Sequence, residues 1–174
     1  MHKIWAQMES LVDKGLVKSI GLSNFNVQST WDILTYCRIK PVCSEIELHP
    51  YNVQDNLVRF LKEYDIHPIG YCPIAKGIET TKYVVSSPNI FEHETVKAIA
   101  ANHKKTGAQV LLKWGVQRGH IIIPKTNSVE RMKENIECLE FDLSEDEVAQ
   151  LCKLDAGVRI CDADAWMASG SIFA

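Results

Sequence analysis

Residues 120–135, HIIIPKTNSVERMKEN, place a strand, a helix start and two basic residues in succession. The three isoleucines predict a fully buried strand, and the proline after them ends its hydrogen-bonding ladder. Lys125 stands at the end of this strand, and Asn127 or Ser128 can cap a helix that carries Arg131. Unpaired backbone N–H groups, the helix dipole and two cations favour a phosphate-binding corner. An ordinary β-to-α turn with solvated charges fits the same residue types.

The composition of the chain narrows its class. Its 174 residues suit one domain with a sizeable core, and the net charge is −3 without any basic run. We therefore expect no nucleic-acid or membrane-surface partner. No apolar stretch approaches the length of a membrane span and no secretion signal opens the chain, so we predict a cytoplasmic protein.

Cysteine and histidine spacing gives no support to a metal site. The six cysteines form no C-x-x-C pair, and the histidines show no H-E-x-x-H spacing. We expect the cysteines to be reduced and largely buried.

The chain in order predicts repeating strand–helix units. A helix over residues 2–14 ends at Gly15, and a strand over residues 16–22 follows it. A second helix begins after residues 23–26. Its predicted inward-facing residues are Trp31, Leu34 and Cys37.

The same alternation then recurs. Strands are predicted over residues 42–48 and 68–72, with a helix from about Gln54 between them. The stretch 75–91 is long for a βα connection and has no regular period, which fits a lid over a ligand or a surface loop without function.

Helices resume at Glu92, and two capping boxes mark further helix starts. They are Thr106 with Gln109 and Ser144 with Glu147. The tail, residues 157–174, is predicted to be an irregular surface loop.

Four buried-type strands, each followed by a helix, predict an α/β fold with a parallel sheet and right-handed crossovers. Polar residues gather at the carboxyl ends of these strands, where both barrels and doubly wound sheets place chemistry. No G-x-G-x-x-G motif follows any strand. Part of a (β/α)8 barrel, of the TIM-barrel type, therefore fits better than a Rossmann fold.

Five stretches, read together, resemble the aldo-keto reductases in order and spacing. They are WAQMESLVDKGLVKSIGLSNFN, PVCSEIELHPYNVQ, IGYCPI, TGAQVLLKWGVQRG and IIIPKTNSVERMKENIE. The resemblance implies an NADPH-dependent oxidoreductase that reduces aldehyde or sugar carbonyls, as aldose, aldehyde and xylose reductases do. It covers residues 4–174 as a single domain, in which the lid would cover the pyrophosphate of the cofactor.

The resemblance assigns cofactor contacts at the strand ends. Ser23 and Asn24 match the pair that hydrogen-bonds the nicotinamide carboxamide, although a helix-capping turn uses the same residue types. Glu45 stands where the family often has glutamine, so it can accept from the carboxamide N–H2 but cannot donate to its oxygen. Tyr71 matches the aromatic residue that stacks on the nicotinamide, and without the resemblance it would be a core aromatic.

The opening stretch acquires a specific role by the same comparison. Lys125, Thr126 and Arg131 match residues that grip the 2′-phosphate of NADPH, and Glu134 and Asn135 match the adenine contacts. Trp166, in the C-terminal loop, would shape the substrate pocket or would simply pack.

The family's catalytic tyrosine, lysine, aspartate and histidine belong to the first four βα units. The resemblance places this chain in the last four, followed by a C-terminal helix and loop, so no residue here is assigned a catalytic role. The first hypothesis is a C-terminal half that works only with its N-terminal half. The alternative is a non-catalytic NADP-binding half-barrel, which two copies could close into a homodimeric barrel.

Overall fold

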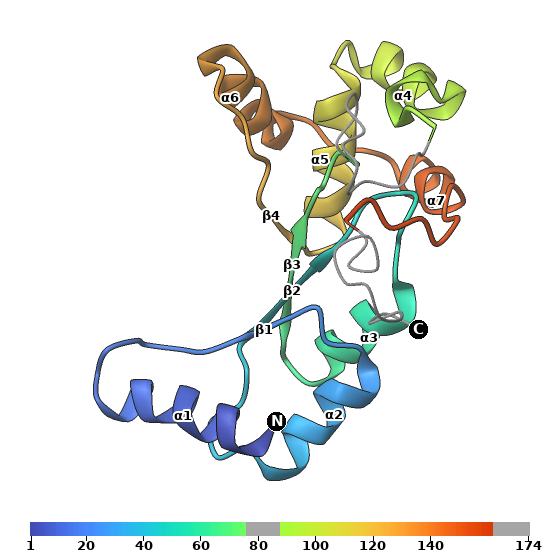
Figure 1. Cartoon of the computed structure of the whole chain (residues 1–174). Coiled ribbons are helices and arrows are strands. Elements are labelled where there is room, and N and C mark those ends of the chain that lie inside the picture. Colours follow the sequence, from blue (N-terminus) through green and yellow to red (C-terminus); the bar gives the residue numbers. More distant parts are fainter. Residues whose placement is uncertain (76–87, 162–174) are drawn as a thin grey trace. The chain divides into compact units, whose positions relative to one another are not determined.

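The computed structural model describes residues 1–75 and 88–161, in which helices and strands alternate (Figure 1). No helix among these residues is long and apolar enough to span a membrane. The elements in chain order are α1 (His2–Asp13), β1 (Leu22–Ser23), α2 (Val27–Tyr36), β2 (Cys43–Glu47), α3 (Asp55–Glu63), β3 (His67–Tyr71), the 3-10 helix η1 (Ile90–Glu92), α4 (Glu94–His103), α5 (Gly107–Gln117), β4 (Ile121–Ile122), α6 (Val129–Ile136), the 3-10 helix η2 (Glu137–Glu140) and α7 (Glu145–Cys152).

The four strands form one sheet in the order β1-β2-β3-β4. β1 and β2 are parallel, with Leu22 opposite Ser44 and Ser23 opposite Glu45. Strand order therefore follows chain order, as expected where helices connect neighbouring parallel strands. The α/β prediction is confirmed, and the arrangement fits part of a (β/α)8 barrel.

The chain divides into two compact units, described separately here. Unit 1 comprises Met1–Ile46 and Asp55–Ile69, and unit 2 comprises Glu47–Gln54 and Gly70–Ala174. The hydrophobic core of unit 1 joins α1, α2 and the segment entering β1. Its buried members are Trp5, Ile20, Leu22 and Ile33.

Local signals in unit 1 set the helix ends as predicted. Gly15 follows the C-cap of α1 with φ +67°, a left-handed conformation that glycine adopts without steric cost. The Asn26 side chain caps α2 by accepting the Ser29 N–H at 2.8 Å. The strand predicted over residues 16–22 is much shorter, however, because β1 begins only at Leu22.

The predicted inward face of α2 was wrong for Trp31. This side chain is 48% exposed, whereas Thr30 and Ile33 are completely buried. The Trp31 ring instead meets the Tyr64 ring edge-on, with 5.4 Å between centroids. Trp31 therefore lies on the outer face of α2, where its ring contacts an aromatic residue outside the core.

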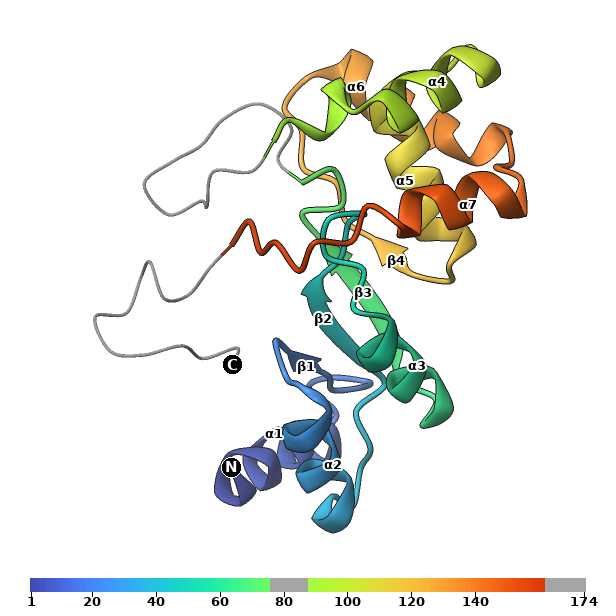
Figure 2. The same ribbon diagram turned by 90° about the vertical axis from the view of Figure 1, so that its right-hand side faces the viewer.

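Unit 2 is built around α5, with α4 packed against α5 and α7 packed against α4 (Figure 2). Both predicted capping boxes are present, at Thr106 with Gln109 and at Ser144 with Glu147. The buried members of its core are Tyr51, Val53, Ala75, Ile90, Val96, Ile99, Val110, Leu111, Trp114, Leu143, Leu151 and Ile160.

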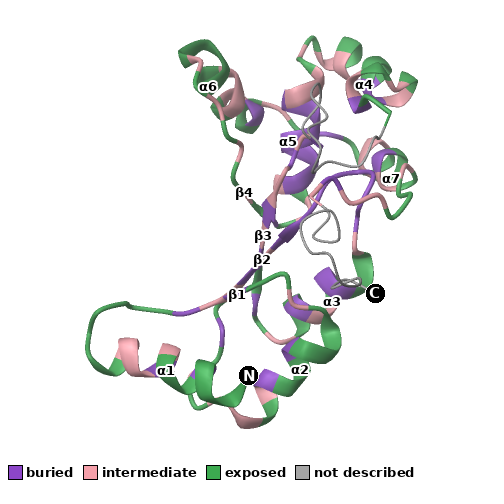
Figure 3. Ribbon diagram, in the orientation of Figure 1, coloured by how far each residue is buried: buried purple, intermediate pink, exposed green. Residues whose placement is uncertain are grey.

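The prediction of a fully buried final strand was wrong. Ile121 is 51% exposed and Ile123 is 44% exposed, and Figure 3 contrasts this segment with the buried face of α5. β4 is last in the strand order, so among the described residues only β3 lies beside it. A strand with one neighbour has one edge of unpaired backbone groups, and its side chains are buried only where another element packs on the face of the sheet.

Two further expectations need correction. Of the six cysteines only Cys138 is buried, and the other five are partly exposed, all of them as free thiols. The tail is irregular over its described part, but it is not confined to the surface, because Ile160 is 1% exposed and belongs to the core of unit 2. The lid prediction falls largely on residues 76–87, outside the described residues.

Candidate functional site

In unit 1, the predicted nicotinamide contacts lie on two paired strands. Ser23 is opposite Glu45 in the register, and the Asn24 backbone N–H donates to the Glu45 carbonyl at 2.9 Å. Ser23 and Asn24 are exposed, and Glu45 is partly exposed. The pairing thus brings all three predicted residues to one short stretch at the end of β1.

Non-glycine residues in the left-handed region follow two of the strands. Asn24 comes directly after β1 with φ +59°, and Cys72 comes directly after β3 with φ +48°. Asparagine tolerates this conformation, whereas a cysteine there costs about 1–2 kcal/mol. Strained residues of this kind persist only where the surrounding structure holds them, and they concentrate at functional sites.

In unit 2, the turn before α6 has the features that the sequence predicts for an anion site. Ser128 caps α6 by accepting the Arg131 N–H at 3.3 Å, and Thr126 accepts the Ser128 N–H at 3.1 Å. Lys125 and Arg131 are exposed. Within the described part of the chain, no ion pair engages either cation. Both charges are therefore available to a ligand.

One carboxylate competes at the same corner. The Ser128 hydroxyl lies 2.7 Å from a carboxylate oxygen of Glu130. This hydrogen bond lowers the pKa of Glu130, with a further contribution from its own backbone N–H. Glu130 is consequently ionised at neutral pH. The corner thus contains the cations Lys125 and Arg131 and the anion Glu130, the last two in the first turn of α6.

The predicted adenine contacts lie further along α6. Glu134 and Asn135 are partly exposed, and the helix has no fully buried residue. α6 is tied to α5 at this point, because the Gln109 amide donates to the Glu134 carbonyl at 3.1 Å. The same helix therefore carries Arg131, Glu134 and Asn135 with their side chains accessible.

Tyr71 ends β3 on the strand next to Lys125. The Ile123 N–H donates to the Gly70 carbonyl at 3.3 Å, one residue before Tyr71 and two before Lys125. Burial raises the pKa of Tyr71 far above its ordinary value, and the negative charge of Glu47 raises it further. The partly exposed phenol ring is thus neutral at any physiological pH, which suits stacking and not proton transfer.

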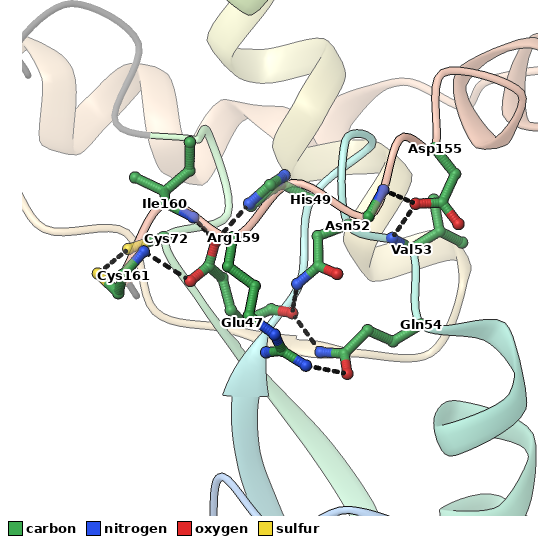
Figure 4. Close-up of polar contacts among 11 residues, drawn as sticks. Glu47, His49, Asn52, Val53, Gln54, Cys72, Asp155, Arg159, Ile160 and Cys161 are labelled. Carbon is green, nitrogen blue, oxygen red and sulfur yellow. Dashed lines mark hydrogen bonds and ion pairs between the residues drawn. The ribbon is translucent and has the colours of Figure 1, made fainter. Parts of the chain in front are cut away.

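Glu47 is the structural centre that sequence reasoning missed. Its side chain is completely buried, and its carboxylate contacts His49 Nε2 at 2.8 Å. The same carboxylate accepts the backbone N–H groups of Ile160 and Cys161, the latter at 2.9 Å (Figure 4). Burial alone would raise the pKa of this carboxyl, but these hydrogen bonds outweigh it and lower the pKa.

A short segment, residues 155–161, crosses the end of β2 and is called the arm here. The backbone N–H groups of Ala156 and Val158 both donate to the Tyr51 carbonyl, at 3.3 and 2.9 Å. The Arg159 guanidinium donates to the Gln54 side chain at 3.3 Å, and that side chain donates to the Glu47 carbonyl at 2.8 Å. The arm is therefore held from both its backbone and its side chains.

One sequence signal could have pointed to Glu47. A carboxylate and an imidazole two residues apart on a strand share one face, and buried carboxylates require partners. Glu47 is the last residue of β2, and His49 follows it at this spacing in a stretch of buried residues. The backbone donors of the arm could not be found in this way, because they lie 113 and 114 residues away in the chain.

The predicted cofactor residues fall in both units, three in unit 1 and six in unit 2. Those six are Tyr71, Lys125, Thr126, Arg131, Glu134 and Asn135. The predicted substrate contact, Trp166, lies outside the described residues. Among the residues the structure does describe, no three metal-binding side chains converge on one point.

Known proteins resemble this chain over most of its length. It is 45% identical over 166 residues to the NAD(P)H-dependent pentose reductase of Pyricularia oryzae. The aligned stretch covers 91% of this chain and 51% of that protein. It is 41% identical over 165 residues to the NAD(P)H-dependent D-xylose reductase of Aspergillus niger, covering 93% of this chain and 52% of that protein.

Aldose reductase C of Dictyostelium discoideum is 40% identical over 161 residues, covering 92% of this chain and 47% of that protein. The chain thus spans about half the length of the curated relatives it matches. The sequence model of the aldo/keto reductase family matches residues 1–156. A match over so large a share of the chain, together with the alternating α/β fold, shows that the chain belongs to the aldo/keto reductase family.

Proposed function

We propose that this chain supplies nucleotide-binding residues to an NADPH-dependent reductase of aldehyde or sugar carbonyls. The observation that carries the proposal is the turn before α6, where exposed Lys125 and Arg131 flank a helix start capped by Ser128. A phosphate group there would meet helix N–H groups and two cations that form no ion pair with a described residue. The relatives' names, which specify NAD(P)H-dependent pentose and D-xylose reductases, support this choice.

The residues of this chain would bind and orient the dinucleotide. Lys125, Thr126 and Arg131 would bind the 2′-phosphate, with Glu134 and Asn135 at the adenine. Tyr71 offers a neutral ring for stacking because its pKa is raised by burial. When bound, NADPH supplies the hydride that reduces a carbonyl carbon.

The strand-end residues of unit 1 would orient the carboxamide of the nicotinamide. Ser23 and Asn24 offer a hydroxyl and an amide, and Glu45 offers only acceptor oxygens when ionised. We assign no residue of this chain to protonate the carbonyl oxygen. The chain alone is therefore expected to bind NADPH without turning it over.

A fluorescence titration with NADPH and NADH tests the phosphate assignment. Arg131→Ala should weaken NADPH binding by about tenfold, the effect of losing one charge-assisted contact of about 1.4 kcal/mol, with little change for NADH. Lys133→Ala is the matched control, since Lys133 is an exposed cation on the same helix outside the predicted site.

Equal losses for both dinucleotides would remove the 2′-phosphate assignment. No binding of either dinucleotide would overturn the proposed function. Oxidation of NADPH by the chain alone with D-xylose would contradict the absence of a catalytic residue.

The exposed isoleucines of β4 favour a second candidate function, a non-catalytic NADP-binding module that pairs with a second copy. Ile121, in β4, and Ile123, directly after it, are about half exposed, and β4 is the last strand in the sheet order. An uncovered strand edge of this kind is a template for pairing. Sedimentation equilibrium discriminates the two: a dimer that binds NADPH would favour the module, and a monomer would reject it.

A further inference from the structure

Two thiols from distant parts of unit 2 meet beside the Glu47 carboxylate. The sulfur atoms of Cys72 and Cys161 are 3.5 Å apart, although 89 residues separate them in the chain. Neither cysteine is in a disulfide, and both are partly exposed. Figure 4 shows the two sulfur atoms facing each other at the end of the arm.

Hydrogen bonds fix the backbone at both cysteines. The Cys161 N–H is bound by the Glu47 carboxylate, and the preceding residue, Ile160, is buried in the core. Cys72 begins a tight turn in which its carbonyl accepts the Ala75 N–H at 2.8 Å. The thiols therefore remain close because their backbones are fixed by other contacts.

We propose that Cys72 and Cys161 are an oxidation site, a thiol pair that closes into a reversible disulfide and ties the arm to the end of β3. A disulfide requires the sulfurs to approach to about 2.05 Å, a movement of roughly 1.5 Å from their present separation. Partial exposure admits a small oxidant such as hydrogen peroxide.

The reaction balances with hydrogen peroxide as the two-electron oxidant. One thiol loses its proton to solvent, the thiolate attacks a peroxide oxygen and the O–O bond breaks, and the departing hydroxide takes up a proton, so that a sulfenic acid and water form. The second thiol then attacks the sulfenic sulfur, the S–O bond breaks, the S–S bond forms and a second water leaves. Two thiols are oxidised and one peroxide is reduced, and a dithiol reductant reverses the product.

The consequence for cofactor and substrate binding rests on the proposed function. Tyr71 immediately precedes Cys72, and the arm leads in sequence toward Trp166. The disulfide would therefore hold the arm to the end of β3, next to Tyr71. Its formation can be measured without any activity, so failure of this proposal and failure of the proposed function are distinguishable.

Peptide mapping of the oxidised chain tests the pairing. The folded chain is treated with a small excess of hydrogen peroxide, free thiols are blocked with N-ethylmaleimide, and digested peptides are identified by mass spectrometry. We expect a linked Cys72–Cys161 peptide as the dominant disulfide, which dithiothreitol removes. Cys72→Ser and Cys161→Ser should each abolish it, while Cys37→Ser, a partly exposed thiol of unit 1, should leave it unchanged.

Two further measurements separate a built site from chance pairing. In concentrated guanidinium chloride the preference for this pair should disappear, because six cysteines then have many possible partners. Glu47→Gln, checked for folding by circular dichroism, should slow formation of the linked peptide several-fold because the arm is less firmly held. Equal blocking of Cys72, Cys161 and Cys37 after oxidation, or an undiminished preference in denaturant, would overturn the proposal.

Discussion

The carboxylate of Glu47 accepts the backbone N–H of Cys161 at 2.9 Å, although 114 residues separate the two in the chain. One buried charge at the end of β2 therefore fixes the path of the arm. Charge-assisted hydrogen bonds to backbone donors are stronger than neutral ones, and a buried donor left without an acceptor is costly. The stability of unit 2 should consequently depend on this side chain.

Replacing Glu47 by alanine should reduce the free energy of unfolding by about 3 kcal/mol or more. The substitution leaves the buried N–H of Ile160 without its acceptor, at about 1–3 kcal/mol, and it also removes the acceptor of the part-buried Cys161 N–H and the buried partner of His49. Urea denaturation measures the loss. Glu45→Ala is the matched control, because that side chain is partly exposed on the same strand and should cost less than about 1 kcal/mol. Equal losses would contradict the importance of Glu47.

The hydrogen bond between His103 of α4 and the Glu147 carboxylate of α7 should make stability depend on pH. His103 Nε2 lies 2.9 Å from a Glu147 carboxylate oxygen, and both side chains are mostly buried. Burial raises the pKa of Glu147, but hydrogen bonds from His103 and Ser144 outweigh it, so the pKa falls below its ordinary value of 4.5. A lowered pKa means that the carboxylate stabilises the fold above about pH 4.5 and loses this effect as the pH falls through the folded-state value.

Glu147→Gln should therefore destabilise the chain by about 1 kcal/mol at neutral pH, and the difference from the unmodified chain should vanish once the pH falls below the lowered folded-state pKa of Glu147. Glutamine retains the capping-box acceptor, so the helix start is preserved. Urea titrations at a series of pH values measure the difference. Glu145→Gln, an exposed change in the same first turn, should show a smaller dependence. A difference that grows on acidification would reverse the assigned sign.

Gly21 should tolerate no side chain, because Cys43, the first residue of β2, approaches it closely. A Cβ at this position would lie 2.5 Å from Cys43 Sγ and 2.9 Å from the Cys43 carbonyl oxygen. The thiol can rotate away but the carbonyl cannot, so Gly21→Ala should lower the free energy of unfolding by about 2 kcal/mol or more. Gly15→Ala is the control: its space is open but its φ is +67°, which predicts a loss of about 1 kcal/mol. Denaturation midpoints of the two variants give the comparison.

Features that depend on neighbouring residues in the chain were predicted correctly. Gly15 ends α1, Ser128 caps α6 and both capping boxes form, because each involves only a few consecutive residues. The strand–helix alternation follows from hydrophobic periodicity for the same reason. Local sequence therefore sufficed for element type and for the helix start at the predicted phosphate corner.

Features that depend on distant contacts were not predictable. Trp31 contacts the rings of Phe60 in α3 and of Tyr64 just after it, and the exposure of Ile121 depends on the position of β4 in the sheet order. The hydrogen bonds between Glu47 and the arm involve backbone N–H groups more than a hundred residues away in the chain. Periodicity identifies which residues can be buried, but the partner that buries them is set by the tertiary structure.

The helix that carries the predicted phosphate and adenine contacts should be the less firmly held of two similarly capped helices. Ser128 accepts the Arg131 N–H at 3.3 Å in α6, and Ser144 accepts the Glu147 N–H at 3.2 Å in α7. α6 has no buried residue, whereas α7 buries Leu151 completely. Loss of a cap costs about 1 kcal/mol, which α6 cannot offset with core packing.

Ser128→Ala should therefore accelerate amide hydrogen exchange in α6 by about fivefold, the effect of about 1 kcal/mol on local opening. Ser144→Ala is the matched control and should change exchange in α7 less, because Leu151 must leave the core before that helix opens. Mass-spectrometric exchange of the two helical peptides measures both effects. Equal acceleration would show that capping, and not burial, limits the local opening of both helices. It would also remove the inference that α6 relies on Ser128 to keep Arg131 at the phosphate corner.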